Sequence, residues 1–143
     1  MATQLRKYVN KLFRENPYSK IVVTGDFNDE TDNDSVLSVL DAKPSGGKMA
    51  NDKLYNCSAA LDLEEKGTYN YKGKWNMLDQ FIVSGNLLNK TANIQISEAR
   101  ILQAEWLFYK DKKYGHRPNA TYGGPNYYGG FSDHLPIYVE VRK

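Results

Sequence analysis

The stretch KIVVTGDFN, residues 20–28, decides the fold. Its β-branched beginning, Lys20 to Thr24, predicts a short buried strand. Asp26 and Asn28 follow at the C-terminal end of that strand. A buried strand with polar side chains at its end is typical of a layered α/β architecture, in which strand ends carry binding and catalytic groups.

The segment before this strand predicts an amphipathic helix. Apolar residues recur with the spacing of one helical face from Leu5 to Phe13. Thr3 is the expected N-cap. Asn16-Pro17 is the expected end, because the residue before a proline avoids the helical conformation. A helix that leads into a buried strand again favours the α/β class.

The rest of the chain predicts further elements of a single domain. Residues 109–132 are rich in Gly and Tyr and lack periodicity, which predicts a long loop that is functional or mobile. We expect short helices at 35–42 and 58–66, strands at 68–71, 77–84 and 94–102, a turn around 72–74, and a half-buried last strand at 137–141.

Composition narrows the class of protein. The chain has 143 residues, of which 41% are hydrophobic and 25% charged, as in ordinary globular domains. Its net charge of +2 gives no support for a strongly basic nucleic-acid surface. Cys57 is the only cysteine, so neither an internal disulfide nor a cysteine metal site can form, and we expect a buried hydrophobe there.

No apolar run approaches the length of a membrane span. Residues 1–6 lack a signal-peptide core, which leaves a cytoplasmic protein or a chain cut from a longer precursor.

The polar residues after the first strand have a chemical and a structural interpretation. The carboxylate of Asp26 could hold or deprotonate a water, and the amide of Asn28 could bind a phosphate oxygen. Asp and Asn also favour plain turns. The four residues 25–28 alone do not decide between the two.

Two further segments carry ionisable groups. Asp79 interrupts the apolar strand at 77–84, where it could pair with a histidine and fix the tautomer of its ring, or could face solvent. In SDHLP, residues 132–136, Asp133 could bind a divalent cation and His134 a phosphate. The same segment could be a capped turn before the last strand.

Taken together and in this order, the motifs resemble those of the endonuclease/exonuclease/phosphatase family. That family contains DNase I-like nucleases, abasic-site endonucleases, sphingomyelinases and inositol-phosphate phosphatases. The resemblance covers roughly residues 21–141 and rests on GDFN at 25–28, TYNY at 68–71 with Trp75, LDQFIVS at 78–84, and SDHLP.

The resemblance implies divalent-metal-dependent hydrolysis of phosphate esters by a phosphodiesterase, nuclease or phosphatase. Asp26 would orient or deprotonate the attacking water, and Asn28 would contact the scissile phosphate. Asp133 would be a ligand of Mg²⁺ or Mn²⁺, directly or through water. His134 would bind the phosphate, and Asp79 would hold the orientation of the ring. A hard cation with oxygen ligands suits the charge that builds up on the phosphate oxygens.

The resemblance also implies a two-layer β-sandwich with outer helices, of which the α/β (α+β) chain 1–143 is the C-terminal half. The earlier half of the family supplies an Asn and a metal-binding Glu, and neither Glu15 nor Glu30 occupies the position of that Glu. We therefore expect a fragment without its N-terminal half. It should self-associate through exposed apolar surface and be weakly active or inactive alone.

Other interpretations stay open at this stage. The chain could be a non-catalytic interaction domain that retains the fold, or an unrelated α/β domain with coincidental turns. His116 could touch a leaving group or be an ordinary loop residue. The Tyr/Gly segment 122–131 could contact substrate or simply pack. The substrate could be nucleic acid, a lipid head group or a small phosphate ester.

Overall fold

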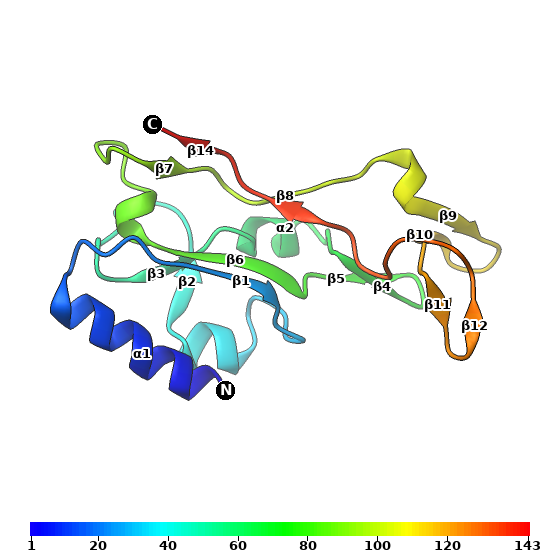
Figure 1. Ribbon diagram of the computed structural model, residues 1–143, viewed down its shortest axis with the longest axis horizontal. Coiled ribbons are helices and arrows are strands. Elements are labelled where there is room, and N and C mark those ends of the chain that lie inside the picture. The colour runs from blue at the N-terminus through cyan, green and yellow to red at the C-terminus, as the bar shows by residue number, and fades with distance from the viewer.

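The computed structural model describes residues 1–143 and confirms a mixed α/β chain with many short strands and few helices (Figure 1). The helices are α1 (Ala2–Glu15), α2 (Ala59–Leu63), a π-helix η1 (Ser35–Val39), and the 3₁₀ turns η2 (Gly85–Leu87) and η3 (Glu105–Leu107). The strands are β1 (Val22–Asp26), β2 (Ala42–Pro44), β3 (Leu54–Asn56), β4 (Tyr69–Tyr71), β5 (Lys74–Asn76), β6 (Asp79–Ser84), β7 (Gln95–Ile96), β8 (Arg100–Ile101), β9 (Phe108–Asp111), β10 (Gly115–Pro118), β11 (Tyr122–Gly123), β12 (Asn126–Tyr127), β13 (Ile137–Tyr138) and β14 (Val141–Arg142). No helix has both the length and the apolar character needed to cross a bilayer.

Helix α1 confirms the amphipathic pattern at the start of the chain. Val9 and Phe13 are buried in the core, and Asn16 is the C-cap in an extended conformation, as the following proline requires. The expected N-cap was wrong. The helix begins at Ala2 with Met1 as its cap, so Thr3 lies inside the first turn, where its hydroxyl makes no capping hydrogen bond.

The main sheet has the strand order β1-β6-β3-β2. Strands β1 and β6 are antiparallel, β3 and β6 are antiparallel, and β2 and β3 are parallel. Successive side chains of β6 point to opposite faces of the sheet and belong to two different hydrophobic clusters. Ile82 packs beneath α1 and η1, whereas Val83 packs on the opposite face with Cys57 and Ala99. The central strand is therefore covered on both faces.

Strand β1 corrects two details of the expected strand. It runs from Val22 to Asp26, so Gly25 and Asp26 belong to the strand itself. It was expected to be buried, yet most of it is exposed, and Val22 keeps 46% of its accessible surface. The physical reason is its place at the edge of the sheet, because it has a hydrogen-bonded neighbour only in β6.

The expected strand at 94–102 and the last strand are each broken in two. Strand β7 pairs with β14 and β8 pairs with β13, which makes two short antiparallel ladders (Figure 1). Ile96 and Val139 from this layer pack on the cluster around Val83. The last strand was expected to be half-buried, but Val141 keeps 65% of its accessible surface.

The Tyr/Gly-rich segment is not the structureless loop that its composition predicts. It folds as two hairpins, β9–β10 and β11–β12, which form the lobe at the right of Figure 1. The hairpin β4–β5 was likewise missed in part: the expected turn around 72–74 is present, but strand β5 after it was not expected. Glycines at positive φ permit these reversals, among them Gly73 (φ +93°) and Gly124 (φ +58°).

Candidate active site

The pairing of β1 with β6 brings two acidic side chains together. Asp26 lies opposite Asp79 in the antiparallel register. Phe27 N–H donates to Leu78 C=O, so Phe27 and Leu78 form a hydrogen-bonded pair of the ladder. Such pairs alternate with non-hydrogen-bonded ones, so the adjacent pair Asp26–Asp79 is non-hydrogen-bonded. In such pairs the Cα atoms come to about 4.5 Å and the side chains are close neighbours on one face. Two like charges placed there repel each other unless each carboxylate has a partner of its own.

Asn28 is the partner of Asp26. Its backbone N–H donates to Asp26 Oδ1 at 2.8 Å, and its side-chain amide donates to Oδ2 at 3.2 Å. Asn28 adopts φ +51°, a left-handed conformation that Asn tolerates better than most residues. The segment is thus a turn, as the structural interpretation held. The same turn places both side chains at one exposed strand end, as the chemical interpretation requires.

His134 is the partner of Asp79. The imidazole Nδ1 lies 2.6 Å from Asp79 Oδ2, and both side chains are largely buried, with 22% and 19% exposure. The hydrogen bond expected between Asp79 and a histidine is therefore present, and the side chain of Asp79 is paired and only partly exposed. A carboxylate at Nδ1 favours the tautomer in which Nδ1 carries the proton, which leaves Nε2 for another ligand. The ring lies on Tyr69, with centroids 4.9 Å apart.

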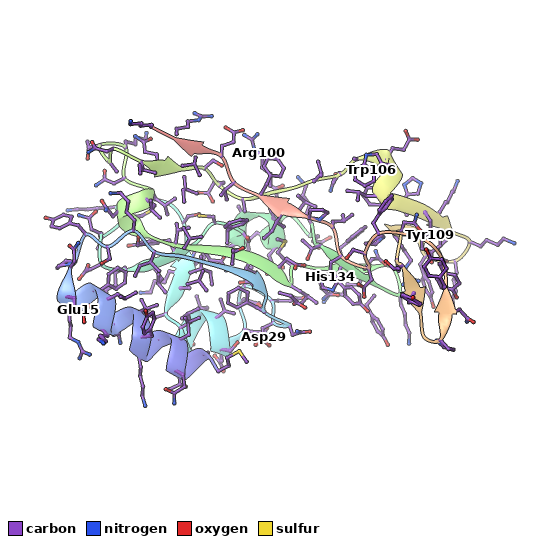
Figure 2. All side chains as sticks on the ribbon, in the orientation of Figure 1. Glu15, Asp29, Arg100, Trp106, Tyr109 and His134 are labelled. Atoms are coloured by element: carbon purple, nitrogen blue, oxygen red, sulfur yellow. The ribbon has the colours of Figure 1, made fainter.

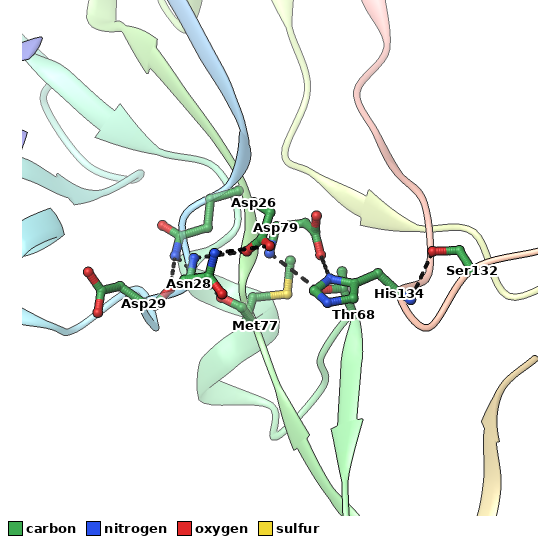
Figure 3. Close-up of polar contacts among 9 residues, drawn as sticks. Asp26, Asn28, Asp29, Thr68, Met77, Asp79, Ser132 and His134 are labelled. Atoms are coloured by element: carbon green, nitrogen blue, oxygen red, sulfur yellow. Dashed lines mark hydrogen bonds and ion pairs between the residues drawn. The ribbon is translucent and has the colours of Figure 1, made fainter. Parts of the chain in front are cut away.

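Thr68 connects the two halves of this pair (Figure 3). Its hydroxyl accepts the Asp79 backbone N–H at 3.3 Å, and its carbonyl accepts the Leu135 N–H at 2.8 Å. Thr68 is fully buried. From the sequence, Thr68 was expected to begin a strand within the TYNY segment but was given no role at the site, because a single buried threonine has no pattern that marks it.

A second supporting residue lies on the reverse face of β6. Gln80 is fully buried, accepts a hydrogen bond from Asn56 Nδ2 at 2.8 Å, and donates to the Asp29 carbonyl at 2.6 Å. It thereby holds the end of the Asp26–Asp29 turn against the sheet. Gln80 lies in the LDQFIVS segment, but its alternation with the apolar side chains of the strand does not distinguish burial from exposure.

The motif residues line one open hollow of about 590 Å³. Its walls are formed by Asp26, Asn28, Tyr69, Leu78, Asp79, Ser132, Asp133 and His134. Ligand atoms of Asp26, Asp79 and His134 all lie within 4.8 Å of one another. Asp133, the expected metal ligand, lines the hollow but is not in that group. It is exposed, and its carboxylate has no hydrogen-bond or ion-pair partner in the chain.

The comparison with known proteins decides the family. The model of the endonuclease/exonuclease/phosphatase family matches residues 1–143. The chain belongs to the endonuclease/exonuclease/phosphatase family. Searches of the curated proteins and of the solved structures found no significant match. The family as a whole hydrolyses phosphate esters, and the hollow at the ends of β1 and β6 holds the residues by which the family was recognised in the sequence.

Other ionisable groups of this endonuclease/exonuclease/phosphatase chain lie apart from the hollow. His116 is exposed on β10, where its ring lies 6.2 Å from that of Phe108. Glu15 ends α1 at the opposite end of the molecule from Trp106, while His134 lies between them (Figure 2). Burial, and to a lesser degree the charge of Glu98, raises the pKa of the Cys57 thiol to about 12. Cys57 is therefore the expected buried hydrophobe and a poor nucleophile.

Proposed function

We propose that this chain carries the site of a divalent-metal-dependent phosphoesterase, acting as a phosphodiesterase, nuclease or phosphatase. The observation that supports it most is the Asp79–His134 hydrogen bond of 2.6 Å in the same hollow as Asp26 and Asn28. Phosphoryl transfer requires a positioned nucleophile and donors directed at the equatorial oxygens. A turn has no need of a part-buried carboxylate–imidazole pair beside it.

Each side chain has a role that its contacts allow. Asp26 would accept a hydrogen bond from the attacking water and orient it or take its proton. Asn28 uses one N–H of its amide on Asp26, so its second N–H remains for a phosphate oxygen. In its imidazolium form, with Nδ1–H donating to Asp79, His134 would donate from Nε2–H to another phosphate oxygen.

The donor set suits a hard cation held by few protein groups. Asp133 offers a free carboxylate at the rim of the hollow. Mg²⁺ keeps several waters and is commonly bound by one or two carboxylates together with substrate phosphate oxygens. We therefore assign Asp133 as the ligand of Mg²⁺ or Mn²⁺. When bound, the ion would neutralise charge on the phosphate and leaving oxygens.

A further structural unit would complete this site. One free carboxylate makes a weak Mg²⁺ site, and β1 exposes Val22 and an unpaired edge. The N-terminal half of the family fold is the proposed unit, and a second copy of the chain could cover the same surface. Size-exclusion chromatography with light scattering should show association of the isolated chain. A clean monomer at high concentration would contradict self-association.

The activity is tested with bis(p-nitrophenyl) phosphate and Mg²⁺ or Mn²⁺, using the protein that contains this chain. His134→Ala and Asp26→Ala should each lower kcat by about 100-fold or more, the usual scale for a group that transfers or positions a proton. The matched controls are His116→Ala, which removes the other histidine, and Asp52→Ala in an exposed turn. The assigned roles would be refuted if kcat fell equally in the motif variants and the controls, or if it fell in neither His134→Ala nor Asp26→Ala. The isolated chain should be much weaker than the complete protein.

A further inference from the structure

A second pocket continues the hollow toward the β9–β12 lobe. Its volume is about 530 Å³, and it shares Tyr69 and Asp133 with the hollow. Its walls include the rings of Tyr109, Tyr122 and Tyr128. A group attached to a phosphate at His134 would therefore enter a pocket with aromatic walls.

The aromatic walls are fixed by the backbone of the lobe. A Cβ atom on Gly123 would come within 2.3 Å of the Tyr128 ring, so the ring rests directly on the glycine backbone. Tyr128 N–H donates to Thr121 C=O at 2.8 Å. The ring of Tyr122 contacts that of Tyr127 edge to face, with centroids 5.3 Å apart. These contacts restrict the rings before any ligand arrives, which lowers the entropy cost of binding.

The charges in this pocket disfavour binding of another anionic group beside the phosphate in the hollow. Arg117 is its only cationic side chain, and its guanidinium lies 3.6 Å from the Asp111 carboxylate. Tyr109 Oη also donates to Asp111, at 3.1 Å. The carboxylate of Asp133 has no partner and adds negative charge. A polyphosphate or the backbone of a long nucleic acid meets only this one cation, which is ion-paired with a carboxylate although its Nε has no hydrogen-bond partner, whereas an uncharged ring can stack on tyrosine.

We propose that the pocket binds the base of a small nucleotide-type ester whose phosphate occupies the hollow. The proposal rests on the proposed function and names its substrate class. It favours a nucleobase over a saturated ring because the exposed faces are aromatic, and stacking of a base on an aromatic side chain contributes about 1–3 kcal/mol. It favours a small nucleotide over a polymer because the pocket lacks a track of cations.

Isothermal titration calorimetry in Mg²⁺ tests this assignment with four probes. Adenosine 5′-monophosphate, ribose 5-phosphate and adenosine separate the base from the phosphate, and myo-inositol 1-phosphate supplies a saturated ring. Adenosine 5′-monophosphate should bind more tightly than ribose 5-phosphate by about 5- to 150-fold, the ratio that corresponds to one stacked base. Tyr128→Ala should remove most of that ratio and leave ribose 5-phosphate unchanged. Tyr128→Phe keeps the ring and should restore it.

The control variant is Tyr18→Ala, which removes an exposed tyrosine next to α1. Circular dichroism will verify that each variant is folded, and Tyr122→Ala replaces Tyr128→Ala should the latter unfold. Equal binding of adenosine 5′-monophosphate and ribose 5-phosphate, or tighter binding of the inositol phosphate, would overturn the proposal. Equal binding of adenosine and adenosine 5′-monophosphate, without binding of ribose 5-phosphate, would support the pocket and overturn the phosphate site instead.

Discussion

Replacing Gln80 by methionine is expected to destabilise the fold and loosen the turn that carries Asp26. Gln80 is fully buried between β6 and the end of that turn. Its amide joins Asn56 on β3 to the carbonyl of Asp29. Methionine has a similar length and shape but neither accepts nor donates these hydrogen bonds effectively. The substitution therefore removes the bonds with little change in packing volume.

The magnitude follows from the groups left without partners. Asn56 is fully buried, so its Nδ2–H loses its acceptor in a place that water does not reach. A buried polar group without a partner costs about 1–3 kcal/mol. The half-buried Asp29 carbonyl adds a smaller cost of the same kind. We expect the free energy of unfolding to fall by about 2–4 kcal/mol, which lowers Tm by roughly 6–12 °C in a domain of this size.

Urea denaturation followed by tryptophan fluorescence measures the change. Gln103→Met is the matched control, because Gln103 is exposed and makes no side-chain hydrogen bond, and it should stay within about 0.5 kcal/mol of the parent. The double variant with Asn56→Ala should cost less than the sum of the single variants, since the two side chains share one bond. A Gln80→Met variant as stable as the control, or strict additivity, would refute this reasoning.

Three further predictions concern groups around the site. Native Cys57 should resist alkylation by iodoacetamide at pH 8 and react fully in urea, because burial raises the pKa of its thiol to about 12; rapid native labelling would contradict its burial. Gly67→Ala should lower the free energy of unfolding by about 1–3 kcal/mol in urea melts, because a Cβ atom there would lie 2.4 Å from the Asn76 carbonyl; unchanged stability would contradict that close approach. Hydrogen bonds from Ser35, and then from Asn33, lower the pKa of Asp29, so ionised Asp29 contributes stability above its unfolded pKa that is lost as the pH falls through the lower folded value. Ser35→Ala should raise that pKa in an NMR titration, and an unchanged value would remove Ser35 as its cause.

Local patterns in the sequence predict the elements that depend on local physics. The periodicity from Leu5 to Phe13 gives α1, and the apolar run at 77–84 gives β6. The exposure of β1 has no such signal, because it depends on which elements pair with the strand. The hairpins of the lobe were missed because their strands are only two to four residues long and alternate weakly.

The residues of the candidate site likewise include some that the sequence predicts and some that it does not. The contact of Asp79 with His134 was predicted by the family resemblance that the three segments carry together, since Asp79 taken alone could equally have faced solvent. Thr68 and Gln80, which hold those segments, were not predicted because a buried polar residue is recognised only by its partners. The sequence also does not reveal that Asp133 lies outside the close Asp26–Asp79–His134 group.

The proposed chemistry requires that Asp79 holds Nδ1 of His134 while Nε2 contacts a phosphate. With only two histidines in the chain, ¹H–¹⁵N NMR resolves both imidazoles, and His116 serves as an internal reference. We predict that neutral His134 carries its proton on Nδ1 and that Asp79→Asn abolishes this preference. Added dimethyl phosphate needs a donor at Nε2, so it should favour the imidazolium of His134 and shift its signals but not those of His116. A mixture of tautomers in His134 like that of an exposed imidazole, with no response to phosphate, would contradict the account.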